Sequence, residues 1–115
     1  MSNFRATDDA RLPTMHGDYV EVEDGVRTYC RHTGVSDAPP LLLLHGNRDN
    51  HSHFAEMESI LGGTHYTVAL DFRCHGLSSK PDCPLSPDLF ARDVEQVIDH
   101  YGWERVTLSA IRSAP

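Results

Sequence analysis

Apolar and polar side chains alternate where the first regular pattern of the chain begins. Over residues 19–23 hydrophobic residues are interleaved with two glutamates, which is typical of a strand with one buried face. Asp24-Gly25 then supplies hairpin-turn chemistry, and residues 26–31 return as a second strand. The polar residues 1–17 contain Pro13 and show no sustained period, so we expect a loose tail there.

Apolar runs without alternation follow the hairpin. Leu41–Leu44 and Tyr66–Leu70 each predict a strand that is covered on both faces, as in a parallel sheet. Val106–Leu108 predicts the beginning of a third buried strand of the same kind.

Helical spacing separates these strands. The first helix can begin at Asp49 or Asn50 and end at Gly62-Gly63; its apolar positions are Phe54, Met57, Ile60 and Leu61. The second begins with Ser86 as N-cap and Pro87 as first residue and ends at Gly102; its apolar positions are Phe90, Val94, Val97, Ile98 and Tyr101. A hairpin followed by strand, helix, strand, helix, strand predicts a doubly wound α/β fold.

Composition narrows the function classes. The 115 residues fit one small domain, and a formal net charge of −7 argues against binding to nucleic acid or to an acidic membrane. The longest apolar run is far shorter than the ~20 residues of a membrane span, and the N-terminus lacks the apolar core of a signal peptide. Cys30, Cys74 and Cys83 form no even-numbered framework, so we expect free thiols and a cytoplasmic location.

Candidate chemistry follows the first buried strand. Ligands gather at the carboxyl ends of strands in an open parallel sheet, and His45-Gly46-Asn47 stands at such an end. Gly46 would let a substrate approach the backbone, and the N–H of Asn47 could donate to a developing oxyanion. The competing interpretation is a tight turn with a structural histidine.

A second polar segment follows the next buried strand. Asp71, Arg73, His75 and Ser78, with Gly76 among them, lie in one short turn. They could form a hydrogen-bonded network that fixes the loop. An acid–base–nucleophile triad is the weaker interpretation, because the members of a triad normally come from separate segments.

In this order and spacing the segments resemble the N-terminal half of the α/β-hydrolase fold family. The resemblance rests on the hairpin, Leu41–Gly46, the Asp-x-Arg-x-His-Gly-x-Ser pattern of Asp71–Ser78, and the helix and strand over 86–108. It covers about residues 18–108 and implies a hairpin plus three parallel strands with two helices, as an incomplete doubly wound sheet. Cys74 departs from the family, which usually has Gly at this position.

The resemblance implies hydrolysis of a small ester-like molecule without a cofactor or metal. A Ser, Asp or Cys nucleophile is expected on a G-x-S-x-G elbow right after the third strand, with Gly46 and Asn47 beside the oxyanion and the catalytic acid and histidine beyond Pro115. Here Ala110, Arg112 and Ala114 fall on the Gly, nucleophile and Gly positions. Because the Arg112 guanidinium stays protonated and has no lone pair to offer, we expect no catalytic residue in this chain.

The closing segment, residues 109–115, has an explanation in the genetic code. Ser-Ala-Ile-Arg-Ser-Ala-Pro can be written TCG GCC ATT CGC TCG GCG CC. Restoring a G in front gives GTC GGC CAT TCG CTC GGC GCC, which encodes Val-Gly-His-Ser-Leu-Gly-Ala and contains a G-x-S-x-G elbow. We therefore hypothesise a single-base deletion near the Leu108 codon and an aberrant C-terminal tail.

Several functions remain open at this point. The favoured one is a truncated, inactive relative of an ester, lactone or thioester hydrolase. Asn47 after His-Gly also resembles the halide-binding position of haloalkane dehalogenases, so a fragment of that type is an alternative. Another is a binding half-domain that is completed by a separate polypeptide. His51-x-His53 suggests a metal site, but the further Asp-His pair of such sites is absent, so no metal is expected.

Overall fold

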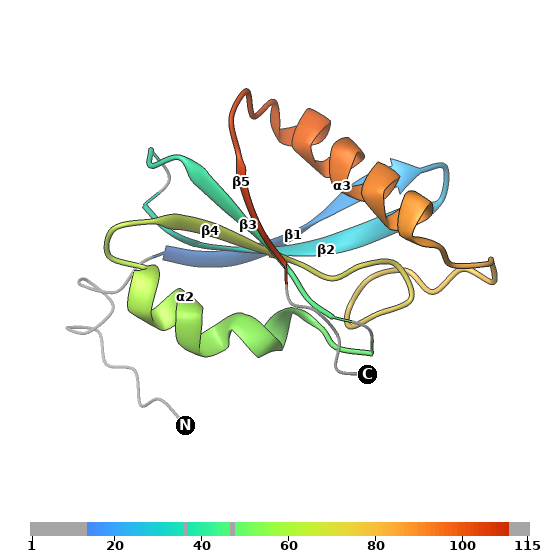
Figure 1. Ribbon diagram of the computed structural model, residues 1–115, viewed down its shortest axis with the longest axis horizontal. Coiled ribbons are helices and arrows are strands. Elements are labelled where there is room, and N and C mark those ends of the chain that lie inside the picture. Colours follow the sequence, from blue (N-terminus) through green and yellow to red (C-terminus); the bar gives the residue numbers. More distant parts are fainter. Residues whose placement is uncertain (1–13, 36, 47, 111–115) are drawn as a thin grey trace.

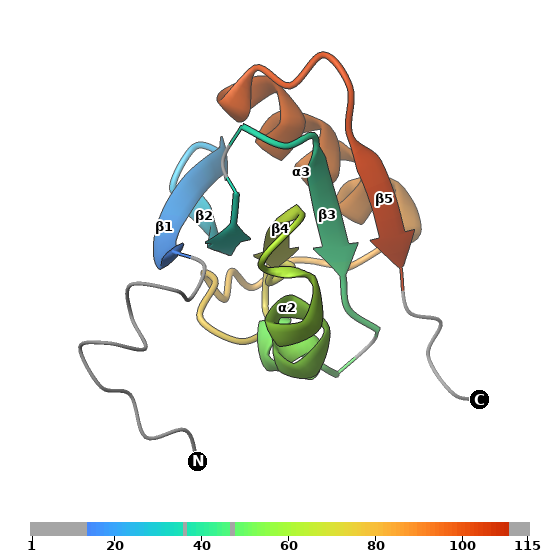
Figure 2. The same ribbon diagram turned by 90° about the vertical axis from the view of Figure 1, so that its left-hand side faces the viewer.

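The computed structural model describes residues 14–35, 37–46 and 48–110, which form one mixed sheet with helices on both faces (Figures 1 and 2). In chain order the elements are β1 (Thr14–Glu23), β2 (Val26–Gly34), β3 (Pro40–Leu44), the 3₁₀ helix η1 (His51–Phe54), α2 (Ala55–Leu61), β4 (Tyr66–Leu70), α3 (Pro87–Tyr101) and β5 (Thr107–Ala110). The strand order across the sheet is β1-β2-β4-β3-β5.

The N-terminal hairpin is longer than the sequence pattern indicates. β1 and β2 pair antiparallel from Thr14↔Gly34 to Glu23↔Val26, and Gly25 takes a left-handed φ of 78° in the turn. Residues 14–17 therefore lie in β1, although we expected a loose tail up to residue 17. Their polar sequence hides the strand because this end of β1 is largely exposed, so main-chain pairing with β2 holds it without an apolar pattern.

The remaining strands confirm the predicted α/β architecture. β4 pairs antiparallel with β2 and parallel with β3, and β3 pairs parallel with β5. The hairpin, three parallel strands and two helices are all present. The last strand has the apolar sequence of a buried strand, but in the described sheet β5 lies at one edge and Leu108 is 51% exposed.

Two core layers explain the unbroken apolar runs of β3 and β4. Alternate residues of these strands, Leu42, Leu44, Val68 and Leu70, pack with Val94 and Val97 of α3. The residues between them, Leu43 and Ala69, pack with Phe54 on the other face, beside α2. Each strand thus buries side chains on both faces, which is why its sequence does not alternate.

The predicted helix ends are largely confirmed. The Ser86 side chain accepts from the N–H of Leu89, Pro87 is the first helical residue, and Gly102 ends α3 with a left-handed φ of 69°. Asn50 caps η1 by accepting from the N–H of Ser52. One predicted apolar core position of the first helix is wrong, because Ile60 of α2 is 74% exposed.

Candidate functional site

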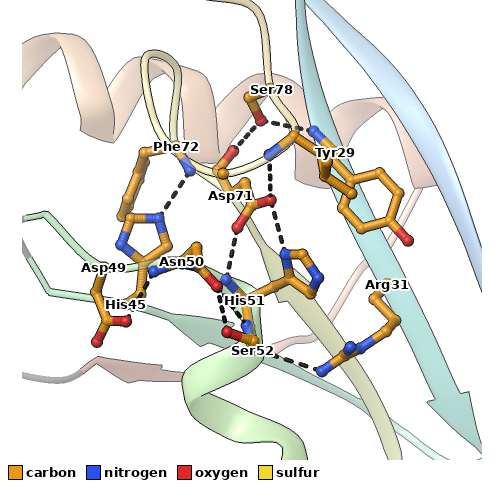
Figure 3. A network of polar contacts seen from close by, with 12 residues as sticks. Tyr29, Arg31, His45, Asp49, Asn50, His51, Ser52, Asp71, Phe72 and Ser78 are labelled. Carbon is orange, nitrogen blue, oxygen red and sulfur yellow. Dashed lines mark hydrogen bonds and ion pairs between the residues drawn. The ribbon is translucent and has the colours of Figure 1, made fainter.

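The loops that follow β3 and β4 meet at one edge of the sheet. Leu44 and Leu70 are parallel partners at the ends of the two strands, so His45 and Asp71 leave the sheet side by side. Figure 3 shows the polar contacts that join these loops to the start of η1 and to β2. Both candidate segments of the sequence, which begin at His45 and at Asp71, start at this edge of the sheet.

Asp71 is the centre of this network. Its carboxylate is fully buried and accepts from the backbone N–H of His51 at 2.6 Å and of Leu77 at 2.9 Å. The His51 ring donates to the same carboxylate through Nδ1, at 2.8 Å. One side chain therefore fastens both η1 and the loop after β4 to the end of β4 (Figure 3).

His45 uses both ring nitrogens to hold the two loops. Nε2 accepts from the backbone N–H of Phe72 at 3.1 Å, so the ring hydrogen lies on Nδ1, which donates to the Gly46 carbonyl at 2.6 Å. Burial lowers the pKa of His45, which keeps the imidazole neutral as this pattern requires. His45 therefore has no ring nitrogen left for proton transfer to a substrate.

Ser78 is also fully engaged. Its hydroxyl donates to the Asp71 carbonyl at 2.6 Å and accepts from the backbone N–H of Tyr29 at 2.8 Å. The side chain is 3% exposed. This geometry ties the loop to β2 and leaves Ser78 no room to act as a nucleophile.

Arg73 points away from the other loop residues, toward α3. Its guanidinium forms a bidentate ion pair with Asp93 at 2.8 and 2.7 Å and contacts Glu23 at 2.5 Å. Hydrogen bonding to Asp93 raises the pKa of Arg73 above its ordinary value. Arg73 and Asp93 are 2% and 1% exposed, so this charge-assisted pair connects the loop to the helix.

The rest of the loop turns through left-handed backbone. Gly76 has φ 52°, and a Cβ there would lie 2.2 Å from Asp71 Oδ2, so only glycine fits. Cys74, where the family usually has Gly, has φ 69°. The His75 ring contacts the Arg73 carbonyl through Nδ1 at 2.9 Å, which is a contact within the turn.

Two of the predicted site positions, Asn47 and Arg112, lie outside the described residues. Gly46 is half-buried, and its carbonyl accepts from the N–H of Asp49 at 3.2 Å as well as from His45. The last residue of β5, Ala110, is the parallel partner of Leu44, so β5 ends beside His45-Gly46 at the same edge of the sheet.

Sequence reasoning missed two partners of the predicted residues. His51 was considered only as a metal ligand with His53, but these side chains pair with different carboxylates, Asp71 and Asp49. Asp93, the partner of Arg73, was not among the candidate residues. Its position three residues after Phe90, within the apolar stripe, is the signal that could have identified it as buried.

The helices described between residues 14 and 110 include none with the length and apolar character needed to cross a bilayer.

Comparison with known proteins agrees with this architecture. The model of the alpha/beta hydrolase fold family matches residues 39–110. A human serine hydrolase-like protein is 36% identical over 77 residues, which are 65% of this chain and 38% of that protein. An uncharacterized hydrolase of Saccharomyces cerevisiae is 30% identical over 90 residues, which are 77% of this chain and 31% of that protein.

Solved structures give the same result. An alpha/beta hydrolase from Novosphingobium aromaticivorans has a TM-score of 0.76 at 26% identity, covering 82% of this chain and 34% of that one. A haloalkane dehalogenase from Bradyrhizobium elkani has a TM-score of 0.74 at 28% identity, covering 85% and 33%. The sequence thus spans well under half of each of these proteins. With its family model matched from the start of β3 to the end of β5, the chain belongs to the α/β-hydrolase fold family.

Proposed function

We propose that the chain carries the N-terminal scaffold of an ester, lactone or thioester hydrolase and has no hydrolytic turnover on its own. The reaction would use a Ser-His-Asp triad on the complete scaffold. The observation that carries the proposal is the parallel register of β5 with β3, which ends β5 beside His45-Gly46. The residues that follow Ala110 in sequence are Ile111, Arg112 and Ser113, where the fold family has its nucleophile elbow.

The described residues of the candidate site support the inactive part of the proposal. His45, Asp71 and Ser78 include the three residue types of a triad, but each is committed to a backbone contact. His45 and Ser78 have both hydrogen-bonding functions occupied. Groups held by such backbone contacts position the two loops.

Serine is the favoured nucleophile of the complete scaffold. The human relative is a serine hydrolase-like protein, and the codon reconstruction of residues 109–115 yields Ser in the elbow. A haloalkane dehalogenase is the second candidate chemistry, because solved enzymes of that name are similar over most of the chain. That chemistry would need Asp in place of Ser at the elbow.

Sequencing the gene through and beyond the Leu108 codon tests the origin of the scaffold. A restored frame that encodes further strands, an Asp and a His supports the proposal. A downstream sequence that encodes none of these in any frame contradicts it.

An assay with an activated phenyl ester tests the lack of turnover. We expect the purified chain to show only the slow rate of its surface histidines, without a burst. The frame-restored protein is the positive control, and its Ser→Ala variant at the elbow is the negative control. Saturable turnover by the original chain would contradict the proposal.

A second candidate function is supported by the edge position of β5. Within residues 14–110 as described, β5 pairs with β3 alone and Leu108 is half exposed, so this part of the sheet offers a strand edge to another polypeptide. A neighbouring reading frame that encodes the missing strands, with a product that co-purifies with this chain, would favour a complementing half-domain. Separate elution of the two chains would reject it.

A further inference from the structure

A cluster of polar side chains lies on the α3 face of the sheet, outside the network of the candidate site. His16 of β1 and His32 of β2 are direct antiparallel partners, and Asp18 follows His16 by two residues on the same face. Tyr101, the last residue of α3, and Tyr66, the first residue of β4, complete the surroundings. The cluster closes the core beneath α3 where the apolar residues of the hairpin end.

The contacts in this cluster leave it accessible from one side. His32 Nε2 lies 2.9 Å from Asp18 Oδ1 and 2.9 Å from the Tyr101 hydroxyl, which donates to Asp18 at 2.6 Å. The His32 ring is buried, at 3% exposure, whereas the Asp18 side chain is 42% exposed and His16 lies at the surface. An ion from solvent can therefore reach the Asp18 carboxylate and the His16 ring directly, and this carboxylate lies against the buried Nε2 of His32.

We propose that His16, Asp18 and His32 form a binding site for a divalent transition metal ion of the Zn²⁺ type. One ligand atom from each residue lies within 4.8 Å of the others, and this is the one such group of three among the residues the structure describes. Two imidazoles and one carboxylate suit Zn²⁺, and a water molecule would complete a four-coordinate site.

The site needs a small closure around the ion. Ligand atoms about 2.1 Å from a tetrahedral Zn²⁺ lie about 3.4 Å from one another. His32 and Asp18 are already within that separation, so the required movement falls on His16. The His16 ring is now stacked on His32 with an interplanar angle of 1°, and parallel rings cannot both point a lone pair at one ion. His16 must turn its ring, which an exposed side chain can do by changing rotamer.

Tyr66 is placed to support His32 as a ligand. Its hydroxyl lies 2.5 Å from His32 Nδ1. With a metal on Nε2, the ring hydrogen moves to Nδ1 and donates to the Tyr66 oxygen, because a hydroxyl can both donate and accept. A hydrogen-bonded partner of this kind fixes the tautomer and the ring orientation of a metal-bound histidine.

Calorimetric titration of the full chain, free of any His tag, with Zn²⁺ tests the site. We expect one ion per chain. The His16→Gln variant should bind at least about tenfold more weakly, and it should fold normally because His16 is exposed. The Tyr66→Phe variant keeps all three ligands and should lose about tenfold in affinity. Co²⁺ provides a second readout: its visible absorption band should appear with the original chain and be absent with His16→Gln.

Two control variants separate this site from other metal-binding groups. His53→Gln removes the other exposed histidine–carboxylate pair, and Cys83→Ser removes a thiol close to Arg73. Both should bind Zn²⁺ as the original chain does. Equal affinity in His16→Gln, a loss of binding in either control, or no one-to-one binding by the original chain would overturn the proposal.

Discussion

Three buried carboxylates determine how loops and helices attach to the sheet at the scale of single residues. Asp71, Asp93 and Glu58 are 0%, 1% and 2% exposed, and each is paired with a cationic or ring nitrogen. A buried carboxylate is tolerated only with such partners, because desolvation of an unpaired charge costs several kcal/mol. Removing one partner therefore lowers the free energy of unfolding by more than the intact pair contributes to it, because the other charge stays buried without a partner.

Replacement of Asp93 by alanine should leave the buried Arg73 guanidinium with the half-exposed Glu23 as its one remaining carboxylate partner among the described residues. We expect a loss of about 3 kcal/mol in the free energy of unfolding, measured by urea denaturation. Asp88→Ala is the control in the same helix, since Asp88 is exposed. Equal effects of the two substitutions would show that the buried pair contributes nothing beyond a surface charge.

Gly76 offers a second test, directed at the loop network. Alanine there would combine a left-handed φ with a Cβ only 2.2 Å from Asp71 Oδ2, so the carboxylate must move away from His51 and Leu77. We expect Gly76→Ala to cost at least about 2 kcal/mol in the free energy of unfolding. Gly63→Ala is the matched control, because no atom lies within 4 Å of the added Cβ. Unchanged stability of Gly76→Ala would contradict the assigned role of Asp71.

Side-chain pairing is also where prediction from the sequence reaches its limit. The helical spacing predicted a buried Ile60, yet Glu58 faces the sheet instead and forms an ion pair with Arg31. Hydropathy assigns a glutamate to the surface, and the burial of Glu58 is favourable because Arg31 and Thr33 of β2 both donate to its carboxylate. The same holds for Asp93, whose partner Arg73 lies on a loop twenty residues earlier in the chain.

At the scale of elements, sequence pattern was more informative. The unbroken leucines predict β3, and Ser86-Pro87 predicts the start of α3. Both elements are present. β5 differs because its burial depends on neighbours on both sides. In the described part of the chain it has one paired neighbour, so an apolar strand lies at an edge with Leu108 half exposed. Such an edge is a site for intermolecular strand pairing.

Replacement of Leu108 by lysine should therefore reduce aggregation, because a charged side chain on an edge strand opposes pairing between copies. Light scattering of concentrated protein, measured against time, gives the comparison. Ile60→Lys is the control: it removes an even more exposed apolar side chain, 74% against 51%, from a helix rather than a strand edge. If both variants lower aggregation equally, general surface hydrophobicity and not the β5 edge is responsible.

At the scale of the whole molecule, two buried histidines link folding to pH. His45 joins the loops at the carboxyl ends of β3 and β4, and His32 lies in the polar cluster beneath α3. Desolvation lowers the pKa of both below the ordinary histidine value of 6.5. Both imidazoles are therefore neutral in the folded chain at a pH where they are already partly protonated in the unfolded chain.

The sign of the pH dependence follows from this difference in bound protons. Below about pH 6.5 the unfolded chain binds more protons than the folded chain, so the free energy of unfolding should fall as pH decreases from 7 to 5. Each histidine can contribute at most about 1.4 kcal/mol per pH unit. Urea denaturation at a series of pH values measures the slope, and the range stays above the main titration of the carboxylates. His45→Gln can still donate and accept, so it should retain the fold with a smaller slope. A stability that is constant or rises toward pH 5 would mean that neither His32 nor His45 is held neutral by burial in the folded chain.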